Sequence, residues 1–175
     1  MKDKNTSTQQ NLMTAFLREC GAYMEYTFYA EQANAEGYRE IYNTFNKFAN
    51  NEKAHAKVWF KLFHAIKDTK ENLIDARDLE HYENSTMYVE FYKKAEEEGF
   101  TDIAALFKKV AEIEKMHEKE YNRLYKQLNN DTFFTKAKST TWQCLNCGNI
   151  IDGETPPDSC PVCSYPKGYF TEKQS

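Results

Sequence analysis

Apolar residues recur at alternating intervals of three and four positions along most of the chain, which is the spacing that places side chains on one face of an α-helix. Four segments show this spacing, covering about residues 11–36, 39–67, 73–98 and 101–129. Gly37 and Gly99 follow the first and third segments, where glycine commonly ends a helix, and Thr101–Asp102 has the character of a helix N-cap. Four long helices with short connections predict an all-α four-helix bundle.

Polar side chains stand near the middle of these helices, at positions where the periodicity requires apolar ones. They are Glu19, Glu52, His55, Glu80, Glu83, Glu114 and His117. A Glu-x-x-His pair alone is a weak signal, because most such pairs are solvated or structural. Five buried carboxylates together, however, would repel one another and be costly to leave unpaired. Since most lysines and arginines lie off these faces, we expect bound cations to neutralise the carboxylates.

The second half of the helical region repeats the first at an offset of 62 residues. The pairs aligned at this offset include Tyr26/Tyr88, Gly37/Gly99, Glu52/Glu114 and His55/His117. Glu19 aligns with Glu80 only after a slip of one residue. The two halves are therefore interpreted as copies of one helical hairpin that agree at their unusual polar positions.

The polar residues match the ligand pattern of di-metal carboxylate bundles, in which two helices each supply a glutamate and two supply a Glu-x-x-His pair. The single ligands are Glu19 and Glu80, and the pairs are Glu52/His55 and Glu114/His117. Carboxylate and imidazole ligands favour iron or manganese. Glu83 exceeds the pattern and would allow one metal to exchange a ligand when its charge changes. Tyr26 and Tyr88 either fill the core or donate hydrogen bonds to a bound oxygen species.

Beyond residue 128 the sequence changes character, with a polar linker and then a segment rich in Gly, Pro and Cys. The predicted boundaries are 1–130 for the bundle, 131–141 for the linker and 142–175 for a small domain that is too short to form a core without a staple. Its staple is the four thiols of "CLNCG" and "CPVCS", namely Cys144, Cys147, Cys160 and Cys163. Such a site binds zinc or one iron. Beside a redox-capable bundle we favour iron, whereas Cys20 is expected to be a small buried side chain.

Composition excludes some classes of function. The 175-residue chain has a formal net charge of −4 and no basic stripe, which argues against a nucleic-acid partner. The polar start "MKDKNTSTQQ" lacks the apolar run of a signal peptide, and no segment has the length of a membrane span. Paired cysteines without an export signal favour a metal site over disulfides. We therefore expect a cytoplasmic protein with no membrane contact.

The whole chain resembles the rubrerythrin family. The resemblance is carried by "NLMTAFLREC", "NEKAH", "EHYENSTMY", "EIEKMHEKEY", "WQCLNCG" and "CPVCSYPKGYF". It implies a ferritin-like bundle with a C-terminal rubredoxin-like domain, and a non-haem di-iron peroxidase that reduces hydrogen peroxide to water. Two features depart from it: "KDTKEN", between the second and third helices, is shorter than in some members, and Cys20–Gly21 follows the first ligand.

The resemblance also implies roles for particular residues and partners. Glu52 and Glu114 would bridge the two irons, and one iron would move from His55 when reduced to Glu83 when oxidised. The thiolate-bound iron would return electrons from an external donor, either rubredoxin or an NAD(P)H-dependent reductase. A homodimer or a larger homo-oligomer is expected, because a domain tethered at the end of the fourth helix is not obviously near its own di-iron site.

Two alternatives remain open at the level of sequence. One is a ferritin-like protein that oxidises and stores iron, against which the cysteine domain argues because storage needs no electron relay. The other is an interaction module that holds only structural metals. Colour and metal content distinguish the last case, because a structural zinc protein is colourless.

Overall fold

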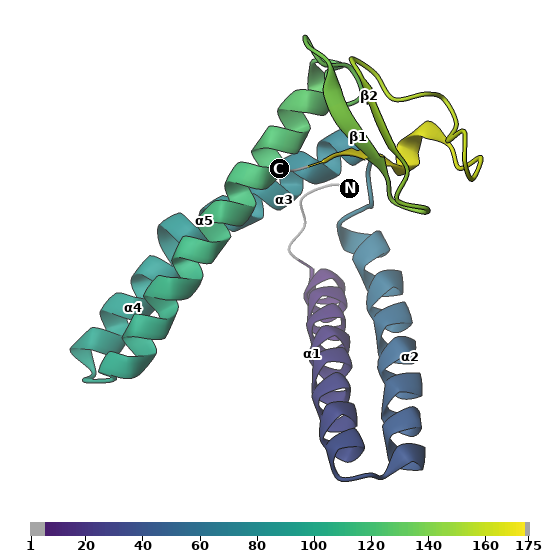
Figure 1. The fold of residues 1–175 in the computed structure, drawn as a ribbon. Helices are drawn as coiled ribbons and strands as arrows, with labels where there is room; N and C mark the ends of the chain where they lie inside the picture. Colours follow the sequence, from purple (N-terminus) through teal and green to yellow (C-terminus); the bar gives the residue numbers. More distant parts are fainter. Residues whose placement is uncertain (1–5, 174–175) are drawn as a thin grey trace. The chain divides into compact units, whose positions relative to one another are not determined.

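The computed structural model describes residues 6–173 and contains two compact units, one ending at Lys67 and the other beginning at Asp68 (Figure 1). The first five and last two residues, which belong to the predicted bundle and cysteine domain, lie outside the described part. Each unit is described by itself below. Within residues 6–173, no helix combines the length and the apolar character that a membrane crossing requires.

The first unit is a hairpin of two helices, α1 (Ser7–Ala35) and α2 (Arg39–Phe63), which lie side by side in Figure 1. Thr6 begins α1 with a reciprocal pair of hydrogen bonds to Gln9, so this helix starts earlier than the apolar pattern predicted. Gly37 turns the chain with a φ of +85°, which favours glycine. The helix α2 ends at Phe63, four residues before the predicted end.

The second unit begins with a longer hairpin. Its first arm consists of α3 (Thr69–Tyr82), the π-helical turn η1 (Glu83–Met87) and α4 (Tyr88–Glu97), and its second arm is α5 (Thr101–Asn129). Asp68 caps α3 by accepting a 2.9 Å hydrogen bond from the Glu71 backbone N–H. Gly99 turns the chain with a φ of +82°, as its counterpart does in the first hairpin. Thr101 is the first residue of α5 rather than its cap, because Phe100 occupies the N-cap position without a side-chain hydrogen bond.

Small side chains allow the helices of each hairpin to approach closely. The buried residues in the helices are all alanines, namely Ala30, Ala33, Ala49, Ala56, Ala95 and Ala104. In contrast, large residues from the predicted inward faces, such as Ile41, Phe48 and Ile103, keep 45–48% of their surface exposed. Each hairpin is therefore one layer of a core whose second layer it does not supply itself.

The chain ends in a three-stranded antiparallel sheet with the order β2-β1-β3. The strands are β1 (Thr140–Cys144), β2 (Ile150–Gly153) and β3 (Phe170–Glu172), and the short 3-10 helix η2 (Lys167–Tyr169) precedes β3. Trp142, Phe170 and two cysteines form its core, and the Trp142 indole N–H donates a 2.9 Å hydrogen bond to the Gly153 carbonyl. The predicted fold class, helical with a small C-terminal metal-knuckle domain, is confirmed.

Candidate metal centres

The first hairpin brings three of the predicted ligands together. His55 Nδ1 lies 2.9 Å from Glu52 Oε2, one helical turn away on α2, and 3.8 Å from Glu19 Oε2 on α1. One ligand atom from each residue lies within 4.8 Å of the others. This hairpin triad (Glu19, Glu52, His55) therefore presents two carboxylates and one imidazole nitrogen to the same small volume.

The second hairpin repeats this arrangement. His117 Nδ1 lies 2.7 Å from Glu114 Oε2 on α5 and 3.6 Å from Glu80 Oε2 on α3. The ligand atoms of the second triad (Glu80, Glu114, His117) again lie within 4.8 Å of one another. The repeat in the sequence is therefore matched by a repeat in the arrangement of the side chains.

Carboxylates crowd the second triad more than the first. Burial, followed by the nearby Glu114, raises the pKa of both Glu80 and Glu83 above the ordinary glutamate value. Burial also raises the pKa of Tyr88, and the charges of Glu83, Glu114 and Glu80 add to the effect. Each shift has the direction expected when a negative charge is removed from water and placed beside others. Glu83 and Tyr88 thus belong to the surroundings of this triad.

The π-helical turn η1 explains how Glu83 joins the triad. From Glu19 to Tyr26 is seven residues, whereas from Glu80 to Tyr88 is eight. The extra residue falls in the segment where the helix widens to a π-turn at Glu83–Met87. A π-turn accommodates one additional residue without breaking the helix, and such turns are frequent at functional sites. The one-residue slip in the repeat is therefore absorbed locally, and Glu80 and Tyr88 both stay on the inward face.

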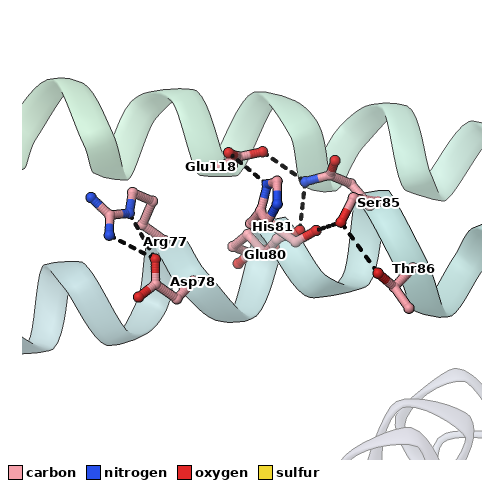
Figure 2. Close-up of polar contacts among 8 residues, drawn as sticks. Arg77, Asp78, Glu80, His81, Ser85, Thr86 and Glu118 are labelled. Carbon is pink, nitrogen blue, oxygen red and sulfur yellow. Dashed lines mark hydrogen bonds and ion pairs between the residues drawn. The ribbon is translucent and has the colours of Figure 1, made fainter.

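A polar network holds the outer side of this turn (Figure 2). The Asn84 side-chain N–H group donates hydrogen bonds to the Glu80 carbonyl, at 2.6 Å, and to Glu118 Oε2 on α5, at 2.8 Å. The other oxygen of Glu118 lies 3.1 Å from His81 Nδ1, a contact that reaches across from α5 in Figure 2. Ser85 Oγ donates to the His81 carbonyl at 2.6 Å. The two contacts with Glu118 tie the irregular turn to α5, whereas the Ser85 hydrogen bond stays within the turn.

The remaining predicted residues differ in their surroundings. Tyr26 packs against Phe45, with ring centroids 6.1 Å apart, and is half-buried in the first hairpin. Cys20 is also half-buried rather than fully enclosed, and burial together with Glu19 raises the pKa of its thiol. Sequence reasoning missed Asn84 and Glu118. The slip in the repeat marked the segment between Glu80 and Tyr88 that contains Asn84, but nothing in the sequence distinguished Asn84 itself or its partner on α5.

The four thiols of the small domain form a tight cluster. Cys144 Sγ lies 3.7 Å from Cys163 Sγ, and Cys147 Sγ lies 3.7 Å from Cys160 Sγ. A tetrahedral ion with metal–sulfur bonds of about 2.3 Å requires sulfur–sulfur distances of about 3.8 Å. A hydrogen bond from the Asn146 side chain helps to lower the pKa of Cys163 to about 6. The spacing and this stabilised thiolate both fit a four-coordinate metal.

Two turns of the same shape build the cluster. Gly148 and Ser164 each follow a Cys-x-x-Cys pair and adopt the left-handed conformation, with φ of +76° and +60°. Their backbone N–H groups each donate a 2.8 Å hydrogen bond to the carbonyl of the first cysteine of the pair. The resulting knuckles present both sulfur atoms of a pair to the same point. Four cysteines therefore converge without a disulfide among them.

The carboxylate and imidazole groups on the helices also fit a bound metal ion. Glu80 Oε2 is buried and has no hydrogen-bond partner among the described residues, although it faces His117 Nδ1 at 3.6 Å. A buried carboxylate oxygen without a donor is costly, and a cation bound by the triad would satisfy it. Hard oxygen ligands combined with imidazole suit iron, while four thiolates suit a single iron or zinc. The residues of both sites thus fit the groups that their types predicted.

Comparisons with known proteins agree with this assignment. The sequence model described as Rubrerythrin matches residues 10–125, and that described as Rubrerythrin, rubredoxin-like domain matches residues 142–171. Rubrerythrin-1 of Clostridium acetobutylicum is 41% identical over 184 residues, covering 95% of this chain and 94% of its own. Rubrerythrin of Nitratidesulfovibrio vulgaris is 33% identical over 180 residues, with coverage of 95% and 94%.

Among solved structures, that of fully reduced, all-ferrous nigerythrin is 29% identical, and the match covers 99% of this chain and 91% of that chain with a TM-score of 0.38. The sequence matches extend across both the helical region and the cysteine domain. The chain therefore belongs to the rubrerythrin family, with the ligands of a di-iron centre in its helical hairpins and those of one thiolate-bound iron in its small domain.

Proposed function

We propose that the protein is a peroxidase that reduces hydrogen peroxide to water at a di-iron centre. The two hairpin triads together would supply six ligands of this centre, and Glu52 and Glu114 would be its bridging carboxylates, as the family resemblance implies. The reaction consumes one peroxide, two electrons and two protons and yields two waters. When bound, a pair of ferrous ions supplies the two electrons that cleave the O–O bond.

The observation that carries this proposal is the extra carboxylate Glu83. The first hairpin has Gly21 and Ala22 in the corresponding region, so only the second hairpin places a third carboxylate beside its triad. Oxidation adds positive charge, and an anionic ligand compensates for it better than neutral imidazole does. An iron that exchanged His55 for Glu83 as a ligand on oxidation would therefore stay bound through a redox cycle. A peroxidase has to retain its metal through each cycle, whereas an iron-storage protein does not.

Two tyrosines, one in each hairpin, would support the reaction as hydrogen-bond donors. The phenol of Tyr88 is protonated at neutral pH, since burial raises its pKa further above the ordinary value near 10, so it can donate a hydrogen bond to a bound oxygen atom. Tyr26 takes the corresponding place in the first hairpin by the repeat.

The four-cysteine site passes single electrons from an external donor, a rubredoxin or an NAD(P)H-dependent reductase, to the centre. Iron storage has no use for such a relay and is disfavoured.

Stopped-flow mixing of the fully reduced protein with each oxidant tests the proposal. We expect reoxidation by hydrogen peroxide to be at least about tenfold faster than by dissolved oxygen, which corresponds to about 1.4 kcal/mol in activation free energy. Glu83→Ala should narrow this ratio while it leaves ferrous iron binding largely intact. Glu90→Ala, which removes an exposed glutamate from α4, is the matched control. Faster reoxidation by oxygen, or the accumulation of added ferrous iron as a mineral, would refute the peroxidase assignment.

A further inference from the structure

We propose that the di-iron bundle of this protein is completed between two copies of the chain. In this arrangement the α1–α2 hairpin of one copy pairs with the α3–α5 hairpin of the other, and the reverse pairing forms a second, equivalent bundle. The inference rests on the di-iron centre proposed above, because it concerns which two hairpins supply the ligands of one centre.

Each hairpin alone holds half of a centre. The first triad has three ligand residues on α1 and α2, and the second has three on α3 and α5. Neither hairpin offers the two Glu-x-x-His pairs that a di-iron carboxylate site requires. A complete site therefore needs one hairpin of each kind, from the same chain or from two chains.

The connection between α2 and α3 decides between these possibilities. Only residues 64–68 lie between Phe63 and Thr69. A ferritin-like bundle contains one long crossover connection, which joins two helices that run in the same direction. Between the two hairpins of a single chain, this crossover has to be the five-residue connection.

The required span follows from the positions of the ligands. Glu52 and Glu80 would lie at the same level, since they belong to one centre. Phe63 lies eleven residues after Glu52, and Thr69 lies eleven residues before Glu80. In parallel helices these distances add to about 33 Å along the bundle. The six steps from Phe63 to Thr69 reach at most about 22 Å when fully extended. The connection is therefore too short to close the bundle within one chain.

A connection of this length would serve a bundle whose successive helices alternate in direction, but that is not the ferritin-like connectivity. A short hinge between two complementary halves favours their exchange between copies.

The exposed faces of the hairpins fit this partner. On the first hairpin, Ile41, Phe48 and Leu62 lie on the same face of α2 as Glu52 and His55 and are 45–48% exposed. On the second, Phe91 and Ile103 lie on the corresponding face and are 44% and 45% exposed. Both faces are apolar around a central group of ligands, and their ligands match through the repeat. A second copy covers both faces at once and closes the assembly with two-fold symmetry.

Complementation between two inactive chains tests the exchange. One variant carries Glu52→Ala and His55→Ala, and the other carries Glu114→Ala and His117→Ala. The two are co-expressed with different tags, the mixed dimer is isolated on both tags, and its iron is counted. In an exchanged dimer the two intact hairpins meet in one bundle and the two damaged hairpins meet in the other. We expect two bundle irons per mixed dimer, against none in either variant alone and four in the wild-type dimer.

The control pairs the Glu52/His55 variant with a Glu19→Ala chain. Both of these damage the first hairpin, so exchange leaves each bundle with a defect and no complete centre should form. Glu52→Gln and Glu114→Gln provide a milder pair if an alanine variant loses its helical circular dichroism.

Three outcomes overturn the exchange: a mixed dimer with no restored iron, an absence of mixed dimers, or a wild-type chain that sediments as a monomer. If the wild-type protein instead sediments as a dimer but binds no bundle iron, the failure lies with the proposed function rather than with the exchange.

Discussion

Asn84 is the side chain on which the irregular turn of the second hairpin depends. It joins the Glu80 carbonyl to the Glu118 carboxylate, and no equivalent contact is needed in the first hairpin, whose helix α1 is regular. A hydrogen bond to a charged group contributes about 1.5–3 kcal/mol. Asn84 therefore positions Glu80 and Glu83 through the backbone rather than through contact with a substrate.

Replacing this side chain should weaken the second triad. We expect Asn84→Ala to lower the free energy of unfolding by about 1–2 kcal/mol, because Glu118 loses a partner, and to weaken ferrous iron binding in the bundle. Ser85→Ala is the control, because its hydroxyl contacts only the exposed side of the same turn. Chemical denaturation and iron titration measure the two effects. Equal losses in both variants would show that the turn tolerates the loss of Asn84.

Glu80 should make the stability of the metal-free protein depend on pH. Burial raises the pKa of Glu80 in the folded state above its usual value near 4.5. The folded protein then binds a proton more readily than the unfolded chain, so this contribution to stability is present at low pH and is lost as the pH rises through the folded-state pKa. We expect Glu80→Gln to gain stability over the wild type as the pH rises above about 4.5. Thermal unfolding of the chelated proteins, followed from below about pH 4.5 up to neutral pH, measures the difference.

The candidate ligands could be identified from the sequence because seven polar residues interrupt a helical periodicity at matching places. The structure groups six of them into two triads and adds Glu83 to the second, while the complete centre remains a prediction. Their polar supports were not predictable. Glu118 is one of four glutamates on α5, and its spacing does not distinguish it in the sequence. Only the folded hairpin brings it next to Asn84 and His81.

At the scale of elements, the π-turn η1 shows how one residue changes a helix without ending it. The repeat revealed that a residue was added between Glu80 and Tyr88, but a widened turn and a local break are equally compatible with that count. The sequence also did not predict that α2 ends as early as Phe63. Ala65 adopts a φ of +24°, which a helix cannot continue through, and alanine gives no sign of it in sequence. Conversely, the helix ends at Gly37 and Gly99 were correctly predicted, because the positive φ that turns the chain there favours glycine.

Deleting Ser85 tests the function of the extra residue. The arm could then continue as a regular α-helix, but Glu80 and Tyr88 would rotate relative to each other by about 100°. We expect the variant to keep its helical circular dichroism and its thiolate-bound iron, yet to retain less than half of the bundle iron. Asn84→Ala, which changes a contact without changing the residue count, provides the comparison. A full complement of bundle iron in the deletion variant would mean that the register of this arm is unimportant.

At the scale of the whole molecule, the two kinds of site have different relations to folding. In the hairpins the candidate ligands are side chains on helices whose buried residues are alanines. In the small domain, Cys144 and Cys160 are themselves part of the buried core. Metal binding and folding are therefore coupled in the small domain. The bundle boundary at residue 130 and the linker at 131–141 remain predictions, since the compact units of the structure divide at residue 67 instead.

Removing the thiolate site should leave the helices intact. The wild-type chain is expected to bind about three irons, from the ligand sets of the two sites. We expect Cys144→Ser combined with Cys160→Ser to bind about one iron fewer, to lose the visible thiolate absorption and to keep its helical circular dichroism. Metal analysis with a visible spectrum measures all three. Loss of the bundle irons as well would show that the two sites depend on each other.

The extra residue in the π-turn also bears on how such a chain could arise. Two identical hairpins related by duplication would build a centre in which both metals have the same surroundings. Insertion of one residue is a discrete genetic event, and here it coincides with the carboxylate that only one hairpin possesses. Under the proposed function, a single codon would separate a symmetric centre with two equivalent metals from one in which the two metals have different surroundings and only one of them can exchange a ligand.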